Sequence, residues 1–249
     1  STVNRRKGLA FIRFFPATGA IFTALLMFAG ANQIQLKEAE TDFNNRRIQV
    51  EKRLNQVAGS LSSAMQIRLN LANSLSAFVI SRRDFSHLEF DDFAQLLQKD
   101  LPGVSSLQLA LQGIVTYLTN LEQNKAALGH DLLADPRRKI IAEKSIREKK
   151  YIISGPVELL QGGRAVIARK PVFVSDKTGG SDRFWGFATV LIDIESMLRD
   201  TAVDELSSEF DFAIRGRDGL GERGEVFEGK ESIFDAYFAI ADIWLPDDA

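Results

Sequence analysis

The sequence has no cysteine and only two histidines among its 249 residues. The lack of cysteine excludes a disulfide scaffold, thiolate catalysis and zinc sites built on thiolates. The histidines, His87 and His130, are 43 positions apart, so an imidazole-based site would have to combine one of them with several carboxylates. Phosphate-loop, zinc-protease and serine-hydrolase motifs are missing as well. We therefore expect no metal and no cofactor, and we expect this chain not to be an enzyme.

A basic stripe is also missing. Residues 1–32 carry four basic residues and no acidic one, whereas residues 33–249 carry 27 basic residues against 33 acidic ones. Nucleic-acid-binding surfaces are strongly positive because they neutralise phosphates. The acidic bulk of the chain therefore argues against nucleic acid as a partner.

One long uncharged run lies near the N-terminus, over residues 14–31, and residues 9–12 extend it. About 20 helical residues cross a hydrocarbon core of about 30 Å, and basic residues before such a helix stay cytoplasmic. We expect a cytoplasmic tail over residues 1–8 and a transmembrane helix over 9–31, with a lipid bilayer as partner. A cleaved signal peptide is the alternative, because the Ala-Gly-Ala triplet at 29–31 is typical of a cleavage site.

The next segment, residues 33–84, carries a regular apolar pattern. Apolar residues recur every seven positions, at Leu36, Phe43, Val50, Val57, Ala64, Leu71 and Phe78, and Leu54, Leu61 and Leu75 follow three of them by four positions. This heptad spacing predicts a long stalk helix that pairs with a second copy in a parallel homodimer. The alternative is that the same stripe packs on the chain's own sheet.

Beyond residue 84 the pattern is that of alternating strands and helices. Apolar alternation predicts strands over 105–111, 114–118, 165–174 and 184–194, and helical spacing predicts helices over 90–99, 135–149 and 195–202. The polar, glycine-rich stretch 177–183 reads as a connection between two units. We expect α/β units over residues 85–180 and 181–249, the second of them short of a final strand.

Four short blocks carry a resemblance to a known family. They are 127–133 (ALGHDLL), 154–156 (SGP), 161–163 (QGG) and 169–173 (RKPVF). Together they resemble the CHASE domain, an extracellular sensor associated with cyclases and histidine kinases. The resemblance covers roughly residues 85–245.

The resemblance implies an α+β fold with an N-terminal transmembrane helix, a long stalk helix and two PAS-like α/β units, one membrane-distal and one membrane-proximal. It also implies a function, the extracytoplasmic, ligand-sensing input region of a transmembrane signalling receptor. Its sensor would face the periplasm from a bacterial inner membrane. The cytoplasmic output, a diguanylate cyclase, a phosphodiesterase or a histidine kinase, would lie outside this chain. The alternative is a ligand-free scaffold that only sets dimer geometry.

The resemblance further implies two ligand contacts. Plant members of the family bind cytokinins through an aspartate in the segment that matches 129–132 (GHDL), which implies Asp131 as the polar anchor of a ligand. Backbone at Ile153, just before the SGP block, is the second implied contact. Arg169 and Lys170 stand where the plant receptors have neutral or apolar residues, which argues against an adenine-type ligand.

The residues themselves point to one more contact. In a strand over 165–174, alternation puts Ile167 and Arg169 on one face and Lys170 on the other. A guanidinium among apolar neighbours needs a carboxylate, and its planar fork suits one. We expect Arg169 either to bind a carboxylate-bearing small-molecule ligand or to pair with Asp131.

Overall fold

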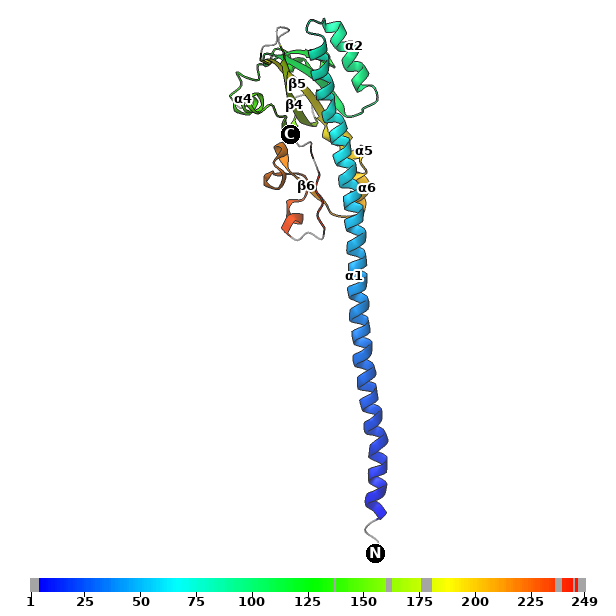
Figure 1. Ribbon diagram of the computed structural model, residues 1–249. Coiled ribbons are helices and arrows are strands. Elements are labelled where there is room, and N and C mark those ends of the chain that lie inside the picture. The colour runs from blue at the N-terminus through cyan, green and yellow to red at the C-terminus, as the bar shows by residue number, and fades with distance from the viewer. Residues whose placement is uncertain are drawn as a thin grey trace. The chain divides into compact units, whose positions relative to one another are not determined.

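The computed structural model describes residues 5–136, 138–159, 163–175, 181–235, 239–243 and 245, with side chains described from residue 40 on. The chain divides into two units, one within residues 1–52 and the other within 53–249 (Figure 1). The second unit holds both the sheet and the candidate site.

Helix α1 (Arg5–Ser81) runs through both units. In the part of the chain that the structure describes, no helix combines the length and the apolar character needed to cross a membrane. From residue 40 on, charged residues such as Arg46, Arg47 and Glu51 interrupt α1, whereas a span needs about 20 predominantly apolar residues. This finding overturns the transmembrane helix over 9–31 in the expected fold class, and the side chains of that range lie outside the described ones.

The second unit is built on a five-stranded antiparallel sheet with the strand order β2-β1-β5-β4-β3. Its strands are β1 (Val104–Leu111), β2 (Ile114–Leu118), β3 (Ile152–Glu158), β4 (Arg164–Val174) and β5 (Arg183–Asp193). The helices around it are α2 (His87–Gln98), α3 (Leu121–Asn124), η1 (Lys125–Ala127), α4 (Lys139–Glu148), α5 (Ile194–Asp200) and α6 (Val203–Glu209). The expected α+β class and the expected strands of this sheet are confirmed.

The central position of β5 corrects the expected pair of PAS-like units. β5 was expected to open the second unit, but it pairs with both β1 and β4. Residues 186–192 are buried without alternation, as fits a strand covered on both faces. The apolar pattern of a strand does not reveal which strands it pairs with. The connection between β4 and β5, two neighbouring strands of one sheet, was therefore predicted to link two separate units.

Past α6, the described residues form a much smaller element than a second PAS-like sheet. They contain a two-stranded antiparallel sheet and short 3-10 helices. These elements are β6 (Ala213–Arg215), η2 (Arg217–Gly219), η3 (Gly221–Arg223), β7 (Val226–Gly229) and η4 (Glu231–Asp235).

The five-stranded sheet is covered on both faces, by α1 and α2 on one side and by α4 on the other (Figure 1). The α1 side holds the larger core, to which the helix contributes five members of the heptad pattern: Val57, Leu61, Leu71, Leu75 and Phe78. From residue 57 on, the stripe therefore packs on the chain's own sheet, as the alternative interpretation had it. The homodimer stays a prediction.

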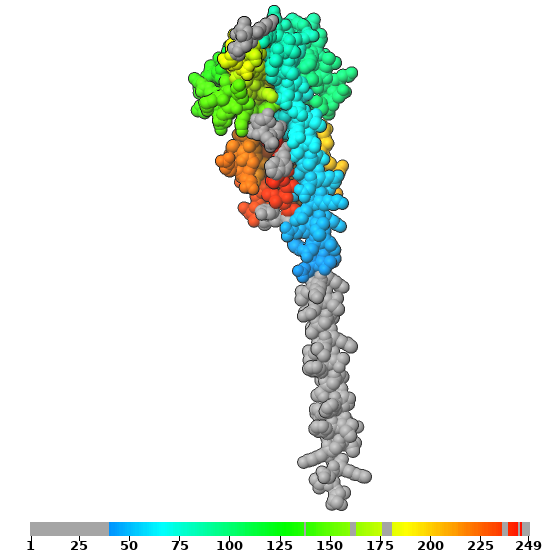
Figure 2. Space-filling model, viewed as in Figure 1, coloured from blue at the N-terminus to red at the C-terminus, as the bar shows by residue number. Residues whose placement is uncertain are grey.

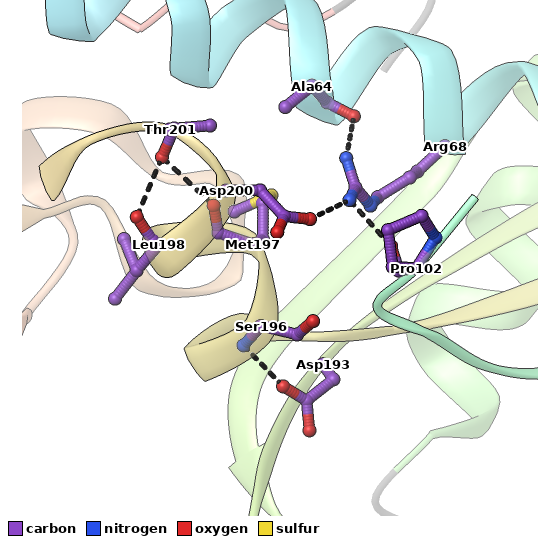
Figure 3. A network of polar contacts seen from close by, with 9 residues as sticks. All are labelled: Ala64, Arg68, Pro102, Asp193, Ser196, Met197, Leu198, Asp200 and Thr201. Atoms are coloured by element: carbon purple, nitrogen blue, oxygen red, sulfur yellow. Dashed lines mark hydrogen bonds and ion pairs between the residues drawn. The ribbon is translucent and has the colours of Figure 1, made fainter. Parts of the chain in front are cut away.

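A buried arginine, Arg68, joins α1 to the segment just before β1 and to the last residue of α5 (Figure 3). The Arg68 side chain, 6% exposed, donates hydrogen bonds to the carbonyl of Ala64 at 3.1 Å, to the carbonyl of Pro102 at 2.6 Å and to Asp200 Oδ2 at 3.0 Å. Pro102 lies just before β1, and Asp200 ends α5. One guanidinium thus fixes the position of α1 against the start of β1 and the end of α5.

Replacing this guanidinium should weaken the fold. Arg68→Met should lower the free energy of unfolding by about 2 kcal/mol, because a carbonyl and a carboxylate lose their donor in a largely buried setting. Urea denaturation measures the loss. In the matched control, Arg82→Met, the ion pair with Glu89 is exposed (58% and 45%), and the change should stay below about 0.5 kcal/mol. Equal losses in both variants would contradict this role for Arg68.

Candidate functional site

The candidate site is centred on Arg169, in the middle of β4. Its strand neighbours are Ile152 of β3 and Thr189 of β5. Ile167 and Arg169 line cavities on the α4 side of the sheet, whereas the Lys170 ammonium donates a hydrogen bond to Asn73 of α1 on the other side. The expected alternation of β4 is confirmed.

Two cavities meet at Arg169. The smaller, of about 280 Å³, extends toward α3, η1 and His130, and the larger, of about 890 Å³, lies between α4, β3 and η2. In Figure 2, the green region of α4 and the orange segment that contains η2 lie next to each other around the larger cavity. Both cavities share one set of lining residues, which is Leu132, Arg138, Val157, Glu158, Ile167 and Arg169.

The Arg169 side chain lines both cavities and has no partner among the described residues. The residue is 8% exposed, and among the residues that the structure describes none forms a hydrogen bond or ion pair with it. Burial, and to a lesser degree the positive charge of Arg138, lowers the pKa of Arg169 to about 10. A buried cation in this state destabilises the folded protein. An anion bound in either cavity would remove that cost.

Asp131, the ligand anchor implied by the resemblance, lies in a turn next to β2. Its Oδ1 atom accepts hydrogen bonds from the backbone N–H groups of Leu133, at 2.8 Å, and Ala134, at 3.0 Å. Asp131 is not among the lining residues of either cavity at Arg169, and no ion pair joins these two described residues. The expected internal pair of Arg169 and Asp131 is therefore not present in the structure. The ligand-binding roles of Asp131 and of Arg169 stay predictions.

Ile153, the other implied contact, lies on β3 opposite Ala168 of β4. The residue is partly buried against the core on the α1 side and is also among the residues that line the larger cavity with Arg169. The structure thus brings two of the three expected site residues, Ile153 and Arg169, to one cavity.

Sequence reasoning missed Arg138, which lines both cavities. It lies in the turn before α4, where Asp135 Oδ2 is 3.5 Å from Arg138 Nε and 3.5 Å from His130 Nε2. The Asp135 side chain is 7% exposed. The Asp-Pro dipeptide at 135–136 indicated a helix start, but α4 begins at Lys139. That shift leaves Arg138 in the turn, a position that no local pattern announces.

A second missed group links the site strand to the rest of the unit. Arg164, at the start of β4, donates to Glu195 Oε1 of α5 and to Glu228 Oε2 of β7, both at 2.7 Å, and to the carbonyl of Phe227 at 2.6 Å. Burial is the largest single effect on Glu195 and would raise its pKa, but its hydrogen bonds and the positive charge of Arg164 together outweigh burial and lower the pKa. The strand that carries Arg169 is thereby tied to α5 and to the small sheet.

Among the described residues, no group of three or more histidine or acidic side chains is placed to hold a metal ion. The model of the CHASE domain family matches residues 111–227, which confirms the family indicated by the four sequence blocks. CHASE is a sensor domain, so the matched range is assigned a sensory role.

Comparison with solved structures supports the fold. The ligand-binding domain of the Pseudomonas aeruginosa PAO1 amino acid chemoreceptor PctC, in complex with GABA, aligns with a TM-score of 0.52 and 12% identity, over 79% of this chain and 84% of that one. No curated protein matches the sequence.

Two further structures align less well. An extracellular ligand binding receptor from Desulfohalobium retbaense has a TM-score of 0.41 and 14% identity, over 65% of this chain and 27% of that one. The extracellular domain of the putative histidine kinase rpHK1S-Z16 has a TM-score of 0.46 and 17% identity, over 67% and 64%. The chain thus spans about a quarter of the first receptor's length.

Removing the charge of Arg169 should stabilise the ligand-free protein. Arg169→Met keeps much of the side-chain volume and should raise the free energy of unfolding by about 1 to 3 kcal/mol at neutral pH. The folded state disfavours the charged form, so the gain should be full below pH 10 and should shrink between pH 10 and 12.5.

Urea denaturation of both proteins in ligand-free buffer measures this difference. If Arg169 had an internal partner, the substitution would remove a buried ion pair and would lower the free energy of unfolding. A loss of stability in Arg169→Met would therefore contradict the unpartnered cation.

Proposed function

We propose that this chain carries the ligand-sensing input region of a signalling receptor, and that its ligand is a small molecule with a carboxylate held by Arg169. The observation that carries the proposal is the buried guanidinium at the junction of two cavities. Arginine binds carboxylates through two parallel hydrogen bonds, and such charge-assisted bonds are strong when water is excluded. The ligand would supply the negative charge that the described part of the protein does not.

The comparisons support the same class of ligand. The PctC domain, similar in fold to this chain, is in complex with GABA, which has a carboxylate. The CHASE match supports an extracytoplasmic position of the sensor, because CHASE domains are extracellular sensors. We further propose that the receptor works as a homodimer and that its output is a diguanylate cyclase, a phosphodiesterase or a histidine kinase.

The contacts of β4 suggest how binding would be transmitted. An anion that neutralises Arg169 acts on the strand that Arg164 ties to Glu195 of α5. The last residue of α5, Asp200, bonds to Arg68 of α1. A ligand that prefers one arrangement of these elements would shift their populations, which is how a sensor biases an output.

Thermal unfolding of the full chain with acetate, butyrate, succinate and glutarate tests the proposal. At least one carboxylate should raise the melting temperature, with a gain of about 2.7 kcal/mol at a concentration a hundredfold above Kd. Arg169→Met should abolish that gain. The matched control, Arg147→Gln, changes an exposed charge of α4 outside both cavities and should keep it.

Two results would contradict the proposal. One is a wild-type protein whose melting temperature responds to none of the carboxylates, which would favour the ligand-free scaffold. The other is an undiminished gain in Arg169→Met, which would place binding away from Arg169.

A further inference from the structure

The charges around the site restrict which carboxylate it takes. Arg169 and Arg138 both line both cavities, so two guanidinium groups face the same space. They are close enough for Arg138 to disfavour the charged form of Arg169. One carboxylate would neutralise Arg169, whereas a second would bind Arg138 in addition to Asp135, whose Oδ2 atom is 3.5 Å from Arg138 Nε.

The acidic residues that line the cavities are Glu158, which lines both, and Glu148 and Asp218, which line the larger one. Asp131 Oδ1 is taken up by two backbone N–H groups, and Asp135 lies between His130 and Arg138. Glu158 is the one acidic residue among those shared by the two cavities, and it is exposed. Among the described lining residues of the smaller cavity, the basic side chains thus outnumber the acidic ones. An ammonium group on the ligand would meet repulsion there.

Size adds a second restriction. The smaller cavity, at about 280 Å³, is slightly below the range for ligand pockets, about 300 to 1,000 Å³. Apolar residues such as Val115 and Leu191 line it beside the two arginines. A short apolar linker between two charged ends matches this lining.

We propose that the ligand is a small dicarboxylate without an ammonium group, with one carboxylate on Arg169 and the other on Arg138. This inference deepens and rests on the proposed function. Arg138, which is less buried and already near Asp135, sets specificity, while Arg169 supplies the main anchor.

Calorimetric titration of the full chain tests the inference with matched probes. Succinate, glutarate and adipate are each compared with the monocarboxylate of the same chain length and with the corresponding ω-amino acid, GABA in the case of succinate. Inorganic sulfate is included to separate a dicarboxylate site from a general dianion site. At least one dicarboxylate should bind about tenfold or more tightly than its monocarboxylate and its amino acid, because a charge-assisted pair is added.

Two arginine variants test which side chain causes the tighter binding of the dicarboxylate. Arg138→Gln should bring the Kd of the dicarboxylate to that of the monocarboxylate and leave the Kd of the monocarboxylate within about twofold. Arg169→Met should remove binding of both. Arg147→Gln, with its melting curve recorded beside that of Arg138→Gln, is the control for the loss of a charge near α4.

Each remaining outcome counts against a defined claim. Equal binding of dicarboxylates and monocarboxylates, tighter binding of an amino acid or of sulfate, or equal weakening of all ligands by Arg138→Gln would overturn the dicarboxylate and leave the carboxylate sensor standing. Failure of every carboxylate to bind would overturn the proposed function itself.

Discussion

Burial of α1 against one face of the five-stranded sheet is the interaction on which the second unit depends. This contact buries the apolar residues of β1, β4 and β5 that point toward the helix, together with half of the residues of the heptad stripe. The opposite face has a smaller core, to which α4 contributes Ala142. That unequal covering leaves room for cavities beside β4. Arg169, a charged residue in the middle of a strand that is paired on both sides, lines these cavities.

The same strand is also the best-connected element of the site. Its first residue, Arg164, bonds to α5 and β7, and its middle residue, Arg169, faces both cavities. The chain of contacts continues from α5 through Asp200 to Arg68 of α1 (Figure 3). Two ion pairs, Arg164–Glu195 and Arg68–Asp200, therefore connect β4 through α5 to the long helix. The proposed transmission of a ligand signal would follow these contacts.

Local patterns predicted four of the five strands of the sheet and the face on which Arg169 lies, because both depend on alternation within a few residues. They missed β3, whose Ser-Gly-Pro block at 154–156 is typical of a turn. They did not reveal that β5 sits between β1 and β4, since strand order is set by contacts between distant segments. The heptad spacing was compatible with a dimer and with packing on the chain's own sheet. The heptad residues from Val57 to Phe78 pack on the sheet. Arg164 was missed for a related reason, as its partners lie on other elements, whereas Arg138 lies in a turn that no local pattern announces.

The resemblance to CHASE domains predicted the family, and the match over 111–227 confirms it. It placed the implied anchor at Asp131, whose carboxylate is engaged with its own turn, whereas physical reasoning about one charged residue in an apolar strand led to the cavities. The family thus indicated the kind of protein, and the charge indicated the kind of ligand.

The state of the Arg169 guanidinium is the central claim, and its side-chain N–H signal in an arginine NMR spectrum reports that state directly. The signal is assigned by its loss in Arg169→Met. In the ligand-free chain it should show no protection from exchange by a hydrogen bond, and saturating dicarboxylate should shift it and slow its exchange. A signal that is already protected without ligand, and that does not respond to any carboxylate, would contradict the account.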